Sequence, residues 1–431
     1  MRKSILALLT LAALTGAGCD WGYASVGDPR DYFFRANEPY AQKLDAHATQ
    51  KYGQTSYVRL WIAWDEFGTQ DSQTGNCVAP SSYGPWAQHV MEAVSDMATT
   101  THKIPLFVIT NDANATPHDD NTLGNAYSAP SPILGPVPSP TNVWPGWDPL
   151  SCAVYELLLR YPGAYIEAWN EPEIGCGYCQ PQTPGLDSFT AAYYFEDMRH
   201  AVQHSGLPAH LIAGAFASAE SGEGTDTQEN CSSAPDVPAD GANSPGYEAS
   251  YICRLKDDWG SAVNSYAPSW SFHDYDDVTN GANYGCGSTG GICNPANLMC
   301  DGRLCLTNFV DLLAYYGLPT NDIWITEAGN NSQVSWARWP GYHNSWWDAS
   351  AGEEFLQLAA TSEAAHLFWY QAIGATDPQA GTPRWDYRDT TPSGWDTGLA
   401  NSDGTPRASW CVLDGHSWHA AEQQTGTPCQ G

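Results

Sequence analysis

Short apolar runs alternate with segments of helical periodicity along most of the chain. Eight such runs are rich in β-branched and aromatic residues, which favour strands. They span 21–26, 56–61, 104–109, 164–171, 211–216, 269–273, 322–329 and 366–370. In the intervening segments apolar residues recur three and four positions apart, which predicts helices. These segments span 86–99, 188–204, 247–259, 306–316 and 353–363.

Strands that alternate with helices predict a parallel α/β fold. A doubly wound open sheet is the competing architecture. However, no glycine-rich phosphate loop follows the early strands, and eight units favour closure of the sheet. We therefore expect an α/β fold of the (β/α)8 TIM-barrel type. Because neither an internal repeat nor a long linker interrupts the pattern, residues 19–431 are predicted to form a single domain.

Three long loops follow strands of the predicted barrel. They span 111–149, 218–244 and 274–301, and the first is rich in Pro, Ser, Asn and Gly. Loops after barrel strands lie on the catalytic face, so these segments are expected to wall a cleft and to be pinned there by disulfides. The alternative is that they only decorate the surface.

Two of the predicted strands end in a glutamate. The run at 164–171 leads into Asn170-Glu171-Pro172, where the proline disfavours further regular structure, and the run at 322–329 carries Glu327. A carboxylate is costly to place at the end of a buried strand, so each is a candidate for function. Cleavage of a glycosidic bond needs such a pair facing one cleft.

Trp169-Asn170-Glu171-Pro172, followed by Ile325-Thr326-Glu327, resembles the catalytic pair of clan A glycoside hydrolases. These enzymes are (β/α)8 barrels that retain the anomeric configuration. The resemblance implies that Glu171, after the fourth strand, is the acid/base and that Glu327, on the seventh, is the nucleophile. It implies neither a cofactor nor a metal. It covers nearly the whole chain after the N-terminal segment.

Other residues match the same clan in order along the chain. Arg59 lies within an apolar run, where an arginine must be paired, and the resemblance implies a contact with Glu327. Asn170 is expected to bind the sugar 2-hydroxyl group. His273-Asp274-Tyr275 is similar to the His-x-Tyr element of the clan, in which the two side chains contact the sugar or the carboxylates.

An aromatic residue of the eighth strand is expected to stack under the sugar. Trp369 is the candidate, and Tyr370 is the alternative because neighbouring strand residues point in opposite directions. The segment Gly398 to Arg407 resembles the linker before the last helix of these barrels.

The charge balance limits the class of partner. The chain carries 48 Asp+Glu against 17 Lys+Arg, for a net charge of −31. Nucleic acids and anionic membrane surfaces would repel such a protein, whereas a neutral carbohydrate would not be repelled. The 19 Trp and 23 Tyr serve mainly as core residues, but rings on a polar surface can also stack on sugar faces.

The N-terminal segment resembles a secretory signal peptide over residues 1–18. Met1-Arg2-Lys3 is basic, an apolar run follows, and the segment ends in small residues before Cys19. Cys19 also resembles the cysteine of a bacterial lipobox, although Gly16 stands where a large apolar residue is usual. The mature protein is therefore expected to be secreted or lipid-anchored at the bacterial cell surface, with any membrane contact made only through Cys19.

The 13 cysteines support export, because an even number remains when Cys19 is set aside. Short spacings favour the local pairs 176/179, 231/253 and 411/429, although the sequence leaves connectivity open. The cluster at 286, 293, 300 and 305 could also be a zinc site, but its spacings are not those of a four-cysteine zinc module. We expect disulfides and no metal.

Taken together, these patterns predict a secreted retaining glycoside hydrolase that cleaves β-linked sugars, in a polysaccharide. One alternative is a non-catalytic carbohydrate-binding barrel, which would need neither glutamate nor Arg59. The other is a structural surface lipoprotein anchored through Cys19, with no affinity for sugar.

Overall fold

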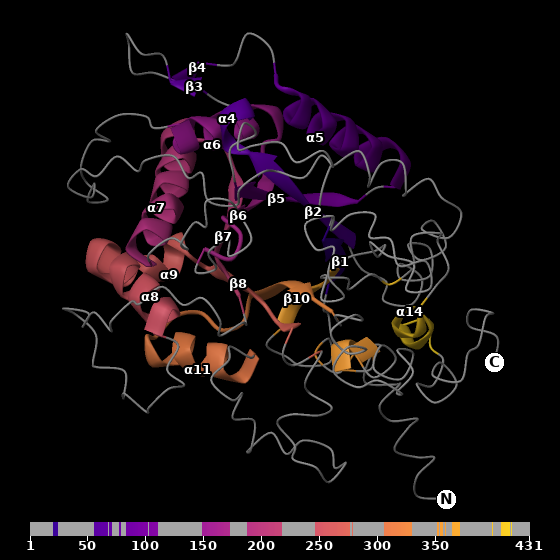
Figure 1. Ribbon diagram of the computed structural model, residues 1–431. Helices are drawn as coiled ribbons and strands as arrows, with labels where there is room; N and C mark the ends of the chain where they lie inside the picture. The colour runs from indigo at the N-terminus through magenta and orange to yellow at the C-terminus, as the bar shows by residue number, and fades with distance from the viewer. Residues whose placement is uncertain are drawn as a thin grey trace, which may run out of the picture.

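A computed structural model describes residues 20–24, 56–67, 69–70, 77–78, 83–101, 103–110, 149–172, 188–217, 246–275, 278, 306–329, 351–352, 354–356, 358, 364–370, 399, 407–413 and 415. Eight parallel strands close into a barrel in the order β1-β10-β9-β8-β7-β6-β5-β2, so each strand pairs with the next one along the chain (Figure 1). This closure confirms the predicted (β/α)8 architecture and excludes the open doubly wound sheet.

The barrel strands fall where the apolar runs predicted them. They are β1 Asp20–Ala24, β2 Ser56–Ala63, β5 Ile104–Thr110, β6 Ala164–Ala168, β7 Ala209–Phe216, β8 Ser269–His273, β9 Ile323–Ala328 and β10 Ala364–Tyr370. A separate antiparallel pair joins β3 Thr69–Gln70 to β4 Cys77–Val78. This pair was not predicted, because two-residue strands carry no periodicity.

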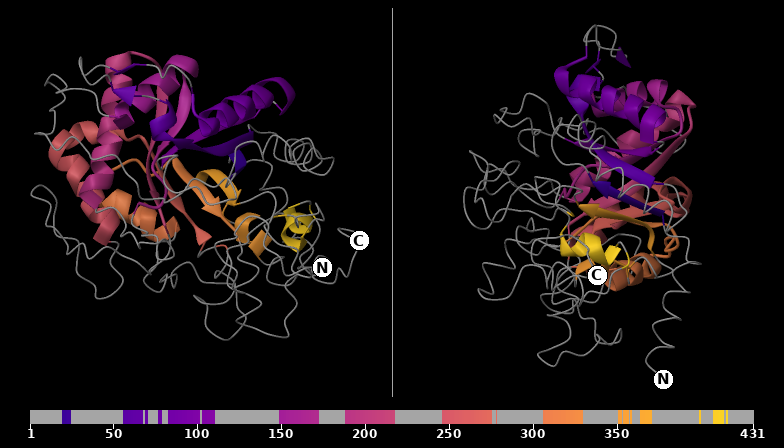
Figure 2. Two further views of the ribbon diagram at one scale, coloured as in Figure 1. Left: turned by 45° about the horizontal axis from the view of Figure 1, so that its top comes forward. Right: turned by 90° about the vertical axis from the view of Figure 1, so that its right-hand side faces the viewer.

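Helices alternate with the strands and lie along the outside of the barrel (Figures 1 and 2). They are α4 Trp64–Phe67, α5 Pro85–Asp96 with the π-helical turn η1 Met97–Thr101, α6 Pro149–Arg160, α7 Ser188–Ser205, α8 Gly246–Trp259, the 3-10 turn η2 Gly260–Ala262, α9 Val263–Tyr266, α11 Leu306–Tyr315 and α14 Ala408–Leu413. Proline opens both α5 and α6, where its missing N–H would have no helical partner. None of the described helices is both long and apolar enough to cross a bilayer.

The side chains of β2, β5, β6, β7, β9 and β10 are divided between two apolar clusters. On β2, Val58, Leu60 and Ile62 pack with the helices in the main core. A second cluster contains Tyr57, Leu106, Ile212, Trp324 and Phe368, which all come from strands, so it fills the barrel interior. The period of two in a strand therefore fixes which residues face inward and which face the helices.

A disulfide joins Cys77 in β4 to Cys152 in α6, 75 residues apart. Cys253 and Cys411 each take part in a disulfide as well, with partners outside the described residues. The bridge between Cys77 and Cys152 was not among the expected pairs, because short spacing does not reveal a contact that the barrel creates. The expected pair 176/179, the cysteines at 231 and 429, and the cluster at 286, 293, 300 and 305 lie outside the described residues. So do the N-terminal segment through Cys19 and nearly all of the three long loops.

Candidate active site

Glu171 lies in a turn just beyond the end of β6. Two residues of this turn have positive φ: Trp169 at 80° and Glu171 at 44°. Such angles are unfavourable for bulky residues and persist only where neighbouring groups hold them. The Trp169 ring is buried and stacks on Tyr194 of α7 at 5.2 Å between centroids, and the Glu171 N–H donates to the Ala215 carbonyl at 2.9 Å. These contacts fix where the Glu171 side chain begins.

Glu327 belongs to β9, on the other side of the barrel opening. Adjacent strand residues normally point to opposite faces, yet both Thr326 and Glu327 bond to groups inside the barrel. The pairing of β9 is irregular at this height on both of its sides, against β8 and against β10. A β-bulge of this kind re-aims a side chain. It explains how Glu327 reaches the opening.

Arg59 joins three of the polar groups at this end of the barrel. Its side chain is fully buried in β2 and donates through Nε to Glu167 Oε2 at 2.6 Å, through Nη1 to Glu327 Oε1, and through Nη2 to Asn170 Oδ1 at 2.8 Å. Burial alone would lower the pKa of Arg59, but the charges of Glu167 and Glu327 outweigh it and raise the pKa. Arg59 therefore remains cationic and holds Glu327 in a fixed orientation.

The second oxygen of Glu327 is also bound. The Tyr275 hydroxyl donates to Oε2 at 2.7 Å, so both oxygens of this carboxylate have partners. Burial raises the pKa of the Glu327 carboxyl above its ordinary value, although His273, Arg59 and the bond from Tyr275 pull it down. The result is a buried, immobilised carboxylate.

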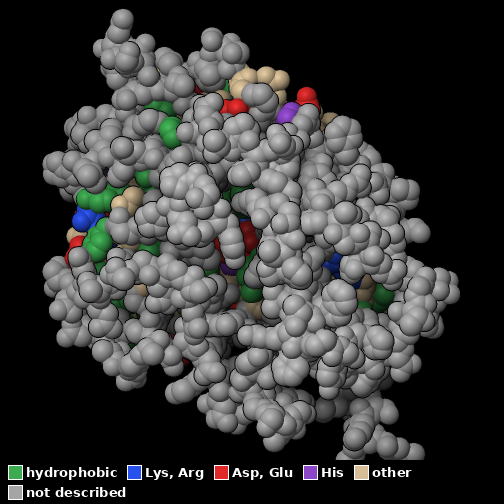
Figure 3. Space-filling model, in the orientation of Figure 1, with side chains coloured by type: hydrophobic (Ala, Val, Ile, Leu, Met, Phe, Trp, Pro, Cys, Tyr) green, Lys and Arg blue, Asp and Glu red, His purple; other side chains and the backbone are tan. Residues whose placement is uncertain are grey.

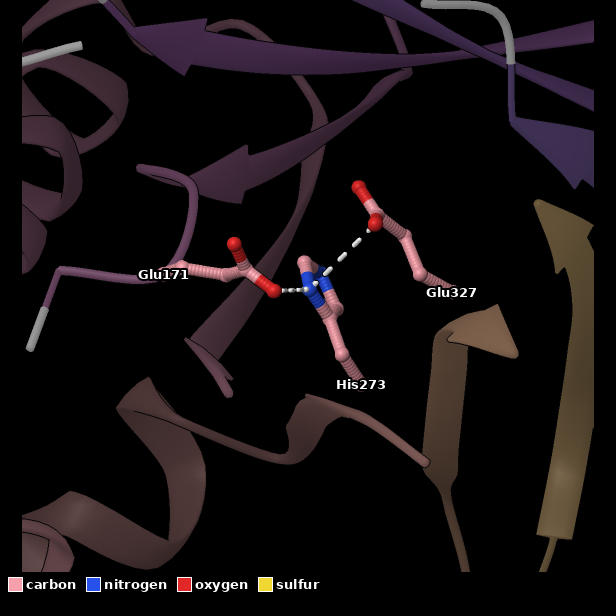
Figure 4. Close-up of side chains that lie close together, drawn as sticks. All are labelled: Glu171, His273 and Glu327. Carbon is pink, nitrogen blue, oxygen red and sulfur yellow. Dashed lines mark hydrogen bonds and ion pairs between the residues drawn. The ribbon is translucent and has the colours of Figure 1, made fainter. Parts of the chain in front are cut away.

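His273 lies between the two glutamates (Figure 4). Its Nδ1 is 2.8 Å from Glu171 Oε1 and 3.6 Å from Glu327 Oε2. One atom each of Glu171, His273 and Glu327 lies within 4.8 Å of the others. The Glu171 side chain remains 23% exposed, against 5% for Glu327, so a ligand can reach Glu171 more easily. Acidic side chains are visible in a recess near the middle of the face drawn in Figure 3.

Glu171, His273 and Glu327 form the one set of three potential metal ligands within the described ranges. Their spacing would allow a cation to bind. However, the Arg59 guanidinium already forms an ion pair with Glu327. Its positive charge would repel a metal cation bound to the same carboxylate. The arrangement fits a pair of carboxylates, one of them held by Arg59, better than it fits a metal centre.

The structure brings most of the predicted site residues together. Glu171, Glu327, Arg59, His273 and Tyr275 form one connected network. Asn170 joins it through its Oδ1, which accepts from Arg59, and its amide –NH2 is then the group that can donate to a ligand.

Trp369 requires a correction. Its ring is fully buried and packs against Phe355 at 5.1 Å between centroids, in the core between the barrel and the helices. Its neighbour Phe368 faces the barrel interior instead. Trp369 thus points away from the opening and cannot stack under a sugar there. The side chain of Tyr370, the alternative, lies outside the described part of the structure, so its role stays a prediction.

Glu167 and Thr326 belong to the network but were not predicted. Glu167 is fully buried in β6 and accepts from Arg59 Nε and, at 2.6 Å, from the Thr326 hydroxyl. The sequence did contain a signal, because Glu167 is a charge inside an apolar strand, as Arg59 is. Two opposite charges of this kind, in barrel strands β2 and β6 on either side of β5, indicate a buried ion pair.

The fold and this network define the class of protein as a (β/α)8 barrel with two glutamates at the carboxyl ends of strands β6 and β9. No protein-family model and no curated protein matches the sequence. Among solved structures, the chain is similar to an exo-β-1,4-mannosidase from Opitutaceae bacterium strain TAV5, with 10% identity, 94% of this chain and 60% of that chain covered, and a TM-score of 0.45. The chain thus spans less than two thirds of that mannosidase.

Two further similar structures cover more of their own chains. A GH5_18 protein from Streptomyces cattleya in complex with GlcNAc shares 13% identity over 96% of this chain and 83% of that chain, with a TM-score of 0.47. The endo-β1,6-glucanase BT3312 shares 11% identity over 92% of this chain and 75% of that chain, with a TM-score of 0.48. At these scores and identities the likeness carries no argument about activity, which must come from the site itself.

Proposed function

We propose that this protein is a retaining glycoside hydrolase that acts on β-linked sugars in a polysaccharide, with Glu171 as acid/base and Glu327 as nucleophile. The observation that carries the proposal is the approach of the two carboxylates. An oxygen of Glu171 and an oxygen of Glu327 lie within 4.8 Å of each other. Retaining sites have carboxyl groups about 5–5.5 Å apart, whereas inverting sites need roughly 6.5–9.5 Å to admit a water molecule.

The surroundings of the two glutamates support the division of roles. Glu327 is buried and fixed by Arg59 and Tyr275, which suits a nucleophile that must be ionised and aimed at one carbon atom. Glu171 is more exposed and bonds through Oε1 to His273, which suits a group that exchanges a proton with the leaving group and then with water.

The reaction proceeds in two displacements. In the first, Glu327 attacks the anomeric carbon while the bond to the glycosidic oxygen breaks, and Glu171 transfers its proton to that oxygen. In the second, Glu171 as a base takes a proton from water, whose oxygen attacks the anomeric carbon and releases Glu327. Asn170 accepts from Arg59 through Oδ1, so we expect its amide –NH2 to donate to the sugar 2-hydroxyl group, a contact that strengthens in the transition state.

The proposal extends to export. The basic start, apolar run and small-residue end of residues 1–18 support secretion, or lipid anchoring through Cys19. The disulfide between Cys77 and Cys152 fits an oxidising compartment. Mass spectrometry of the mature N-terminus from a bacterial host tests this part. Cleavage after Gly18 with an acylated Cys19 supports anchoring, cleavage without acylation supports secretion, and an intact N-terminus contradicts both.

The activity is tested by screening the purified protein on plant, fungal and bacterial polysaccharides with β linkages and determining the anomer of the first product by NMR. We expect hydrolysis with retention. Binding without hydrolysis would favour the carbohydrate-binding barrel, and an inverted product would contradict the assigned chemistry.

Azide separates the roles of the two glutamates. In Glu171→Ala, an aryl β-glycoside with a good leaving group should still form the covalent intermediate, and azide should release the β-glycosyl azide because azide needs no base. In Glu327→Ala, azide should occupy the gap left by the carboxylate and give the α-glycosyl azide. Glu92→Ala, at an exposed position of α5, is the matched control and should behave as wild type. The same azide anomer from both variants would overturn the assignment.

A further inference from the structure

Glu171, the acid/base of the proposed function, has a strained backbone conformation. Glu171 has φ 44°, two residues after Trp169 at 80°. Backbone of this kind is held by its surroundings rather than by its own preference. Among the described residues, the group that holds the Glu171 amide is the Ala215 carbonyl, 2.9 Å away at the end of β7. The position of Glu171 therefore depends on the conformation of β7.

The end of β7 is itself irregular. Gly214 has φ 110° and Ala215 has φ 59°, and the pairing of β7 with β8 shifts register between Gly214 and Phe216. Ala215 is thus the extra residue of a β-bulge. A Cβ atom at Gly214 would lie 2.3 Å from the Ser271 carbonyl oxygen, so only glycine fits there. The bulge turns the Ala215 carbonyl toward Glu171.

The Ser271 side chain closes this bulge. Its Oγ accepts the Ala215 N–H at 2.9 Å and donates to the Ala213 carbonyl at 3.4 Å. The side chain is fully buried on β8, two residues before His273, which contacts Glu171 from the other side. An unbroken strand would satisfy these backbone groups by pairing with its neighbour. At the bulge the Ser271 hydroxyl group satisfies the Ala215 N–H and the Ala213 carbonyl instead.

We propose that Ser271 is a positioning residue for the acid/base. The connection runs from Ser271 Oγ to the Ala215 N–H, through the left-handed Ala215, and from its carbonyl to the Glu171 N–H. Loss of the hydroxyl group would leave the Ala215 N–H buried without a partner and free the bulge to relax. The Glu171 backbone would then move, while Glu327, which is fixed by Arg59 and Tyr275, would stay in place. This inference rests on the proposed function.

A series of aryl β-glycosides tests the proposal, because only poor leaving groups need the proton from Glu171 in the first step. General acid catalysis contributes about 10²–10⁴-fold, so Ser271→Ala should lower kcat/KM for an unactivated phenyl glycoside about tenfold or more beyond its effect on the dinitrophenyl glycoside. A merely structural defect would lower kcat/KM equally for all leaving groups. Uniform loss, or no loss, would overturn the proposal.

Ser269→Ala is the matched control. Ser269 lies on the same strand, two residues before Ser271, and its hydroxyl donates to Asp322 Oδ2 at 2.5 Å. The substitution removes the same hydroxyl group from β8 without touching the bulge. It should leave the dependence on leaving group as in wild type. If Ser269→Ala changed that dependence as strongly as Ser271→Ala, the bulge would not be the cause and the proposal would fail.

A double variant tests whether Ser271 acts through Glu171. When Glu171 is already alanine, adding Ser271→Ala should cause no further loss with the phenyl glycoside, since there is no acid left to misplace, whereas independent effects would multiply. A further loss would show that Ser271 acts elsewhere. If Ser271→Ala does not fold, Ser271→Cys fills the same space with a weaker acceptor and must show the same selective loss at smaller size. Absence of any hydrolysis by the wild-type protein would instead remove the proposed function, and this inference with it.

Discussion

The two ends of the barrel interior are built from the same strands but differ in their side chains and in their roles. At the amino end, the inward residues are apolar, three of the five buried ones are aromatic, and they pack together, with Tyr57 edge-on to Trp324 at 5.4 Å between centroids. Two residues further along β2 and β6, Tyr57 is followed by Arg59 and Tyr165 by Glu167. On these two strands the inward side chains therefore change from apolar to charged within two residues. One end stabilises the barrel and the other holds the reactive carboxylates.

The comparison shows what makes charge tolerable inside a barrel. An unpaired buried charge is costly, and at the polar end the buried carboxylates of Glu167 and Glu327 each have a cationic partner and a hydroxyl donor. Glu167 receives Arg59 and Thr326, and Glu327 receives Arg59 and Tyr275. The aromatic end needs no such partners. We therefore expect substitutions at the two ends to separate stability from activity.

The largest effect is expected at the aromatic end. Phe368 is fully buried, and Phe368→Ala should lower the free energy of unfolding by about 3–5 kcal/mol through lost burial and the cavity left behind. At temperatures where the variant stays folded, kcat/KM should match wild type. Phe368→Leu is the matched control and should lose less than about 1.5 kcal/mol. A large activity loss in the folded Phe368→Leu protein would erase the distinction between the two ends.

The next effect is expected at Arg59. Arg59→Lys keeps the charge but cannot hold Glu167, Glu327 and Asn170 at once, so kcat/KM should fall about a hundredfold or more while the protein stays folded. Arg254→Lys, at an ion pair with Asp258 on α8, is the same substitution outside the barrel and should change kcat/KM little. Near wild-type kinetics for Arg59→Lys would make the arginine structural only.

A smaller and more specific effect is expected at Glu167. Glu167→Gln removes one of the two carboxylates that share Arg59, so the guanidinium acts more strongly on Glu327 and the pKa of Glu327 falls. Since Glu327 must be ionised to attack, the acid limb of the pH profile of kcat/KM should move to lower pH. An acid limb that stays in place or moves to higher pH would contradict this coupling.

The sequence predicted the barrel well because an apolar run rich in β-branched and aromatic residues marks its strands, although the run at 21–26 is weak. β8 was predicted from Ser269 to His273 and has those bounds. The glutamates were found because each follows an apolar run at a strand end. What the sequence could not supply was the local irregularity of the strands. The bulge at Ala215 and the shifted pairing of β9 depend on contacts between strands, which no single run reveals.

The incorrect placement of Trp369 has a similar cause. Phe368, Trp369 and Tyr370 are consecutive aromatic residues, so composition cannot tell which face each one takes. A shift of one residue exchanges the two faces of a strand. The structure settles the parity through Phe368, which joins Tyr57 and Trp324 inside the barrel. Glu167 was not predicted because its partner Arg59 is 108 residues away in β2, and only the closed barrel brings the two charges together.

The smallest expected effect concerns a buried carboxylate outside the barrel. Glu196 of α7 is 1% exposed, and a hydrogen bond joins its carboxyl group to that of Asp258, another acid, whereas Glu167 is bonded to Arg59. Burial, with a further contribution from the Asp258 charge, raises the pKa of Glu196 well above its ordinary value. The folded state therefore binds a proton that the unfolded state releases once the pH exceeds the ordinary value. Stability from this group is present at low pH and is lost as the pH rises toward the raised pKa.

Glu196→Gln should remove that pH dependence and, at a pH above the raised value, increase the free energy of unfolding by about 0.5–2 kcal/mol. Urea unfolding at a series of pH values measures both quantities, and kcat/KM should not change. Asp257→Asn, at an exposed position of α8, makes the same change of charge and should leave the pH dependence as in wild type. If Glu196→Gln destabilised the protein at every pH, Glu196 would have compensating partners as Glu167 does. Pairing of buried charge would then extend beyond the barrel interior.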